Sequence, residues 1–103
     1  MLLKSGASPR ISDNQGQTPL HRAASLGHAG IVEILLENDA AIDKQDAQGD
    51  SPLHLAIEEN QETVIKMLVG YGANVNLENG RLATPMSMAS PRIKKLMSQQ
   101  MNG

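Results

Sequence analysis

Residues 18–21 read Thr-Pro-Leu-His, and this pattern returns as Ser-Pro-Leu-His at 51–54 and as Thr-Pro-Met-Ser at 84–87. The prolines therefore recur at the same spacing of 33 residues twice in succession. Small residues keep the register as well, since Ala23 is matched by Ala56 and Ala89. Two recurrences in register are not a coincidence. They predict a structural unit that repeats along the chain and packs on its neighbours.

Each unit can be read as a pair of helices. A Ser or Thr followed by Pro is a helix start, because the hydroxyl accepts an otherwise unpaired amide hydrogen and Pro needs no partner in the first turn. Gly27 and, one period later, Asn60 are residues that tolerate the left-handed conformation at a helix end. The apolar stretches 31–36 and 64–69 predict second helices that pack against neighbouring units. Polar, glycine-containing stretches then predict projecting turns.

The period and the signature Thr-Pro-Leu-His-x-Ala resemble the ankyrin repeat. The resemblance implies an all-α ankyrin-repeat solenoid of paired antiparallel helices with projecting turns, forming a single domain over residues 1–103. Within it, we expect the second half of an earlier repeat, two complete repeats and a degenerate C-terminal capping repeat, at 1–12, 13–45, 46–78 and 79–103.

The two ends of the array are expected to differ. In the last unit Ser87 replaces His, and Ser90-Pro91 starts another helix. The polar residues opposite the apolar stripe of that helix are typical of a capping repeat with one solvent-exposed side. The first complete repeat has only the remnant 1–12 before it. Apolar surface around the first helix of residues 18–26 and near Ile31 and Leu35 should therefore be partly bare, which predicts self-association through that end, fraying of residues 1–12 or further repeats upstream.

Composition disfavours several classes of function. With 9 Lys and Arg against 11 Asp and Glu, the net charge is -2 and there is no basic excess for nucleic acid. No apolar run approaches the roughly 18 residues of a membrane span, and no signal peptide is apparent. The absence of cysteine excludes disulfides and thiolate metal sites and is compatible with the cytoplasm or the nucleus. Those compartments are the predicted location.

No set of residues has the pattern of a catalytic or metal centre. His21, His28 and His54 lack the spacing of metal ligands, and the resemblance implies that His21 and His54 tie helix starts to neighbouring turns by hydrogen bonds. Glu58 and Glu59 are adjacent on a helix and point apart, which does not suit acid–base catalysis. The sequence therefore predicts neither enzymatic activity nor a cofactor.

The resemblance implies that a partner protein binds along the turn tips and the exposed side of the first helices, which together form a concave face. Arg22 with Leu26 is predicted to be a small hot spot. Acidic residues of the middle repeat would suit a partner with a basic patch. The predicted partner-binding residues are Asn14, Gln15, Gln17, Arg22, Ser25, Leu26, Ala47, Gln48, Asp50, Leu55, Glu58, Glu59, Arg81 and Met88.

The predicted function is thus a non-enzymatic protein–protein interaction module. Two alternatives remain open. Stretches such as 20–24 and 46–56 resemble the C-terminal repeats of the gankyrin group, which implies an assembly chaperone for an ATPase subunit of the proteasome regulatory particle. The chain could also be a structural spacer, or a fragment of a larger multidomain protein.

Overall fold

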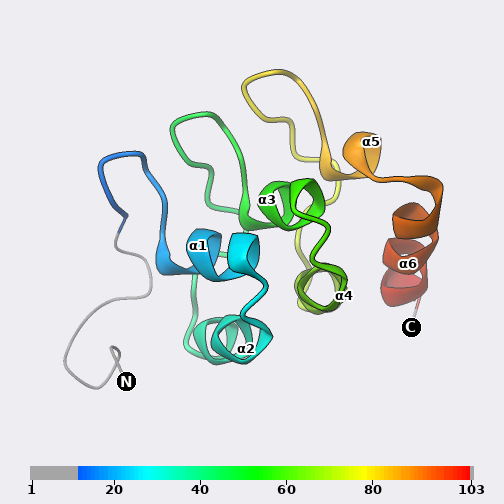
Figure 1. The fold of residues 1–103 in the computed structure, drawn as a ribbon, viewed down its shortest axis with the longest axis horizontal. Helices are drawn as coiled ribbons and strands as arrows, with labels where there is room; N and C mark the ends of the chain where they lie inside the picture. The colour runs from blue at the N-terminus through cyan, green and yellow to red at the C-terminus, as the bar shows by residue number, and fades with distance from the viewer. Residues whose placement is uncertain (1–11, 103) are drawn as a thin grey trace.

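The computed structural model describes residues 12–102, which contain helices and turns and no β-strand. All six helices are shown in Figure 1. The predicted all-α fold is confirmed. The predicted remnant at 1–12 lies, apart from Ser12, outside the described residues. The helices are α1 (Pro19–Leu26), α2 (Ala29–Glu37), α3 (Pro52–Glu58), α4 (Glu62–Gly70), α5 (Pro85–Met88) and α6 (Pro91–Asn102).

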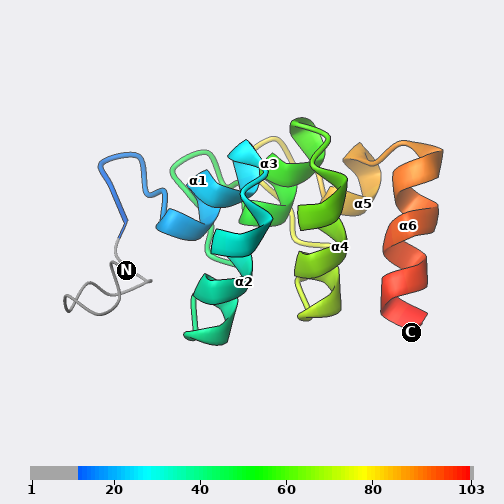
Figure 2. The same ribbon diagram turned by 60° about the horizontal axis from the view of Figure 1, so that its bottom comes forward.

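The helices form two layers. In one layer α1 packs on α3 and α3 on α5, and in the other α2 packs on α4 and α4 on α6. Figures 1 and 2 show this arrangement from two directions, with each first helix beside the second helix that follows it. The loops before α1, α3 and α5 project from the same edge of the stack (Figure 1). Within residues 12–102 no helix has the length and apolar character needed to cross a membrane.

The predicted helix starts are confirmed at all three positions. Thr18, Ser51 and Thr84 are extended N-cap residues, and each side chain accepts a hydrogen bond from the backbone N–H three residues later. Proline occupies the first helical turn each time, where its missing N–H leaves no acceptor unpaired. Local sequence therefore sets where each first helix begins.

The turns between paired helices also follow the prediction. Gly27 ends α1 in the left-handed conformation at φ 76°, and Asn60 takes the matching position at φ 57°. The side chain of Gln61 then reaches back to the previous repeat, where its amide donates to the carbonyl of Ser25 at 3.0 Å. The shape of this turn follows from the conformational preference of its residues, and the bond from Gln61 joins it to the previous repeat.

The core lies between the two layers. It is built from aliphatic side chains at matching positions, of which Leu20 and Leu53 on the first helices are fully buried, as are Val32 and Ile65 on the second helices. The expectation that Leu35 would be partly bare is wrong. It is 6% exposed because it packs into this core.

The last unit is shorter in its first helix and longer in its second. The helix α5 has only 4 residues, whereas α6 has 12. Ile93 and Met97 of α6 are buried, and Leu96 packs against the core beside them. Arg92 of α6 also forms an ion pair with Glu62 of α4. The predicted apolar stripe is therefore the side of α6 that covers the preceding repeat.

Candidate partner-binding surface

Each projecting turn is closed by a side-chain oxygen at its first residue. In the middle turn, Oδ1 of Asp46 accepts the backbone N–H groups of Gln48 and Asp50 at 3.0 and 2.9 Å. Asp13 and Asn79 make the same pair of bonds in the first and last turns. Such local hydrogen bonds from side chain to backbone favour the turn over other backbone conformations, so the turns hold a defined shape.

The carboxyl group of Asp13, at the start of the first turn, has a lowered pKa. Its pKa lies below the ordinary 3.8, chiefly because the backbone N–H of Gln17 donates to the carboxylate. Desolvation opposes this effect, while Gln15 N–H and the positive charge of Arg22 add to it. The ionised carboxylate is thus the form that supports the first turn.

Two buried histidines connect successive repeats. The backbone N–H of Thr18 donates to Nδ1 of His21 at 3.1 Å, so the proton lies on Nε2, which donates to the carbonyl of Asp50 at 2.8 Å. His54 repeats this arrangement, from Ser51 N–H at 3.0 Å to the carbonyl of Ala83 at 2.9 Å. Both nitrogens of each ring are therefore hydrogen-bonded, and each ring holds the start of its helix against the next turn.

The turns and the first helices form one surface, which we call the inner surface, and two hollows lie along it. The first, the leucine hollow, lies between α1 and α3 and has a volume of about 190 Å³. Leu55 comes from the second repeat and the other lining residues come from the first. It is lined by Gln17, Arg22, Ser25, Leu26 and Leu55.

The second hollow, the turn hollow, lies between the middle and last turns and has a volume of about 430 Å³. Across it, the guanidinium of Arg81 lies 3.8 Å from the carboxylate of Glu58, and both side chains are well exposed. An ion pair in such contact with solvent contributes little stability. Gln48, Asp50, Glu58, Gly80 and Arg81 line this hollow.

Most predicted partner-binding residues lie where a partner could touch them. Four of them, Gln17, Ser25, Leu55 and Met88, are half-buried. Asp50 departs from the expectation: it is 6% exposed, and its carboxylate accepts a hydrogen bond from the side chain of Asn79 at 2.8 Å. The exposed ones are Asn14, Gln15, Arg22, Leu26, Ala47, Gln48, Glu58, Glu59 and Arg81.

The acidic surface of the middle repeat is consequently smaller than expected. Asp50 is turned inward to Asn79, and Glu58 already faces Arg81. Glu59 remains exposed. Glu62, which stood near them in the sequence, is paired with Arg92 instead. The structure brings these carboxylates to different partners rather than to one site.

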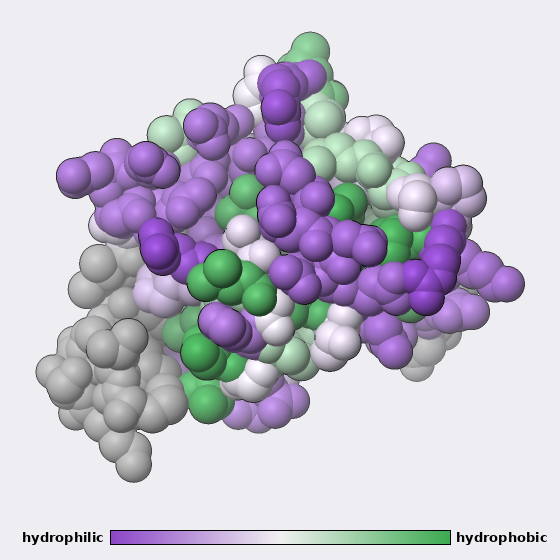
Figure 3. Space-filling model, viewed as in Figure 1, coloured by the Kyte–Doolittle hydropathy of each residue, from purple (hydrophilic) through white to green (hydrophobic). Residues whose placement is uncertain are grey.

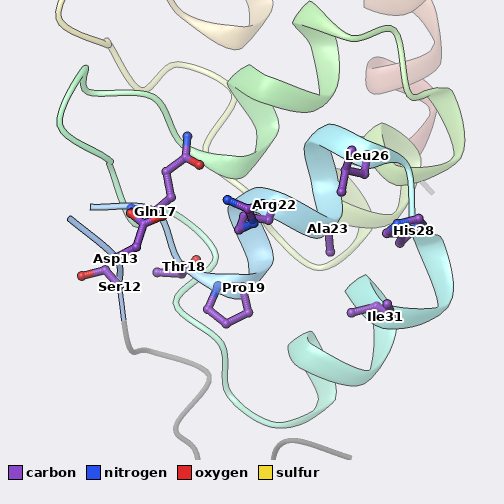
Figure 4. A pocket seen from close by; sticks show the side chains of 10 residues that line it. All are labelled: Ser12, Asp13, Gln17, Thr18, Pro19, Arg22, Ala23, Leu26, His28 and Ile31. Carbon is purple, nitrogen blue, oxygen red and sulfur yellow. The ribbon is translucent and has the colours of Figure 1, made fainter. Parts of the chain in front are cut away.

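A third hollow, the terminal hollow, lies at the N-terminal end of the stack and has a volume of about 440 Å³. Figure 4 shows Pro19, Ala23 and Leu26 of the first helix and Ile31 of α2 around it. Ile31 is 51% exposed, as expected from the sequence. Figure 3 shows apolar patches over α1 and α2 on a face that is otherwise largely hydrophilic.

One feature of the surface was missed from the sequence. Leu82 at the tip of the last turn has φ 61° and a side chain that is 74% exposed. The register contained the signal, because the matching positions hold Gly16 and Gly49, both with positive φ. A third left-handed residue could have been inferred from that alignment.

Within residues 12–102 no three His, Asp or Glu side chains gather as a cation site would require. His28, the third imidazole, lines the terminal hollow. The hollows are instead lined by a mixture of aliphatic, amide and charged side chains at the surface, a composition suited to contact with another macromolecule.

Comparison with known proteins identifies these repeats. The family model of ankyrin repeats in three copies matches residues 1–79. An ankyrin repeat-containing protein of Schizosaccharomyces pombe is 44% identical over 41 residues, which are 40% of this chain and 20% of that protein. The potassium channel AKT1 of Arabidopsis thaliana is 56% identical over 39 residues, which are 38% of this chain and 5% of the channel. The chain thus matches only a fifth or less of these relatives, and it belongs to the ankyrin-repeat family.

Proposed function

We propose that the chain binds a partner protein through its inner surface, with the turn tips and the exposed sides of α1 and α3 as the contact. Ankyrin repeats in general mediate protein–protein interaction. The observation that supports this surface is the position of the leucine hollow and the turn hollow, which lie on it in succession. The amide, charged and aliphatic side chains that line these hollows suit a protein contact, because such interfaces combine apolar contacts with hydrogen bonds and a polar rim.

The construction of the surface supports the same proposal. The turns are connected to one another, since the N–H of Ala47 donates to the carbonyl of Gln15 at 2.8 Å and that of Gly80 to the carbonyl of Gln48 at 2.9 Å. The histidines fix the helix starts behind them. A contact surface on such a scaffold loses little conformational freedom when a partner docks, which favours affinity.

A double charge reversal tests this surface. Arg22→Glu with Glu59→Lys changes two exposed side chains of the inner surface and leaves the net charge unchanged. We expect proteins that are captured from cell extract by the wild-type chain to be lost with this variant, because close like charges oppose docking. Capture is measured by quantitative mass spectrometry.

A matched control makes the same charge change elsewhere. Glu33→Lys with Lys66→Glu alters exposed residues of the second helices, α2 and α4. We expect this variant to retain the captured proteins, and both variants to melt within a few degrees of the wild type, since exposed substitutions change stability by only about 0.5 kcal/mol. If the control variant loses the same proteins while the inner-surface variant keeps them, the partner binds the other face.

The finer roles rest on the sequence alone. A gankyrin-like part in proteasome assembly stays a prediction, as do the basic partner, the cytoplasmic or nuclear location, self-association through the N-terminal end, and the spacer or fragment alternative. Of the acidic residues that suggested a basic partner, Glu59 is exposed and lies outside the ion pair of Glu58 with Arg81.

A further inference from the structure

We propose that the leucine hollow takes a protein segment that carries an apolar side chain next to a carboxylate. The apolar side chain would lie between Leu26 and Leu55, and the carboxylate would pair with Arg22. This inference rests on the proposed function, because it names the chemistry of a partner for the same inner surface. Three features of the hollow support it.

The first feature is the exposure of Leu26, which the fold does not require. The side chain is 60% exposed at the end of α1. The matching position of the next repeat holds Glu59, so a charged residue is accommodated there by the same architecture. An apolar side chain gains nothing from solvent, and burying it under a partner would be favourable by the hydrophobic effect. Leu26 is therefore suited to contact with a ligand.

The second feature is the charge of Arg22. The matching positions hold Leu55 and Met88, which are half-buried, whereas Arg22 is exposed. The ion pairs within residues 12–102 join other residues, and the positive charge of Arg22 is among the smaller causes that lower the pKa of Asp13. Its planar guanidinium can still bind a carboxylate through two hydrogen bonds.

The third feature is the size of the hollow. Pockets for small-molecule ligands measure about 300–1,000 Å³, and the leucine hollow is smaller, at about 190 Å³. It has room for a single aliphatic side chain rather than for a whole metabolite. A side chain projecting from a longer segment, which makes its other contacts along the inner surface, fits this shape.

The charges along the surface also set the position of the segment. One repeat further on, the positions that match Ser25 and Leu26 hold Glu58 and Glu59. A carboxylate displaced by one repeat would meet Glu59, and Glu58 whose charge is balanced by Arg81, instead of Arg22, and the exposed like charge of Glu59 opposes its binding. The surface therefore favours one register for an acidic and apolar segment.

The test uses a phage-displayed library of random dodecapeptides, selected on the full chain. We expect the selected peptides to share an Asp or Glu close to a Leu, Ile or Met. A synthetic peptide of this consensus is then titrated by fluorescence anisotropy. We expect Arg22→Glu to weaken its affinity by about fivefold, in keeping with an exposed charge pair, and Leu26→Ala to weaken it by about tenfold, as for a hot-spot residue.

Two controls locate the occupant. Replacing the acidic residue of the peptide by Lys should restore binding to the Arg22→Glu variant and weaken binding to the wild type. Ile31→Ala removes an exposed apolar side chain that lines only the terminal hollow, whereas Leu26 lines both hollows. Binding should be unchanged in this variant. If Ile31→Ala weakens the affinity as much as Leu26→Ala does, the peptide lies over the N-terminal end and the inference is wrong.

The remaining outcomes separate this inference from the proposed function. Peptides without the expected pattern that respond to Glu59→Lys, but not to Arg22→Glu, would leave the inner surface as the binding face and overturn the chemistry assigned to the leucine hollow. A library that yields no binding peptide overturns that chemistry as well. Peptides that respond only to Lys66→Glu would contradict both proposals.

Discussion

The middle turn and the last turn have the same backbone shape but meet different neighbours. Gly49 has φ 81°, and a Cβ built on it would lie 2.5 Å from the backbone nitrogen of Gly80 in the next turn. Gly16 is in the same position, with Ala47 N at 3.1 Å. Leu82 in the last turn keeps the positive φ and carries a full side chain. The difference separates two reasons for glycine: left-handed φ is required at every turn, but space is limited only where another turn stacks on top.

The largest effect should come from the histidine that connects those two turns. His54→Ala would leave the N–H of Ser51 without a partner in a buried site, remove the bond to the carbonyl of Ala83, which keeps only the N–H of Asn79, and open a cavity. We expect a loss of about 3 kcal/mol in the free energy of unfolding, measured by urea denaturation with circular dichroism.

Ser87 occupies the matching position of the last repeat and supplies the control. Its hydroxyl bonds only within its own turn, to the N–H and the carbonyl of Thr84, at an exposed site. Ser87→Ala should therefore cost only about 0.5 kcal/mol. Equal losses for both variants would mean that the bridge between repeats contributes nothing beyond the local helix cap.

The next effect concerns the space above Gly49. Gly49→Ala combines a left-handed φ with a collision against the backbone of Gly80, and we expect a loss of about 2 kcal/mol or more. Gly72→Ala isolates the first cause, since Gly72 has φ 98° and nothing lies within 4 Å of an added Cβ. This control should cost about 1 kcal/mol. The explanation by stacking fails if the two variants denature at the same urea concentration.

Leu82→Gly should have a smaller effect of opposite sign. Removing the leucine relieves the strain of the left-handed conformation, which costs a non-glycine residue about 1–2 kcal/mol. Against this, a glycine is more flexible in the unfolded chain, and the extra entropy it loses on folding costs about 0.5–1 kcal/mol. The net result should be a stabilisation of about 0.5 kcal/mol, because the exposed leucine loses little burial. A lower melting temperature for this variant would indicate that the leucine side chain stabilises the turn by packing.

The smallest effect should be the pH dependence of the first turn. The pKa of Asp13 is lower in the folded chain, so its ionised form contributes stability above the unfolded pKa of about 3.9, and this contribution is lost as the pH falls through the folded value. Asp13→Asn keeps the acceptor oxygen, as Asn79 does in the last turn. The melting temperatures of wild type and variant should differ slightly at pH 6 and converge in acid. A difference that is constant with pH would contradict this account.

Much of the fold could be predicted because its signals are local. The Ser or Thr before each proline caps a helix through a bond to a residue three positions later, and Gly27 and Asn60 adopt the left-handed conformation for which their residue types are suited. Much of the candidate site followed from the register of the repeats in the same way. Arg22, Glu59 and Arg81 were correctly expected to be exposed.

What could not be predicted depends on neighbours that are distant in sequence. Asp50 was expected on the surface, but the stacked turn behind it places Asn79 at its carboxylate. Leu35 was expected to be partly bare, although it is buried in the core that the repeats share. The pairing of Glu58 with Arg81 likewise joins two repeats. Periodicity states which residues are equivalent; it does not state which of them meet across the boundary between repeats.

By itself, the sequence determined the repeating unit, its helix starts and its turns, because hydrogen bonds within a few residues and the steric limits of each residue type are encoded locally. Only the tertiary structure decided which side chains of those units remain available. The leucine hollow exists because α1 and α3 pack side by side and bring Leu55 next to Arg22 and Leu26. Its position and shape are properties of two repeats in contact, and neither repeat contains them alone.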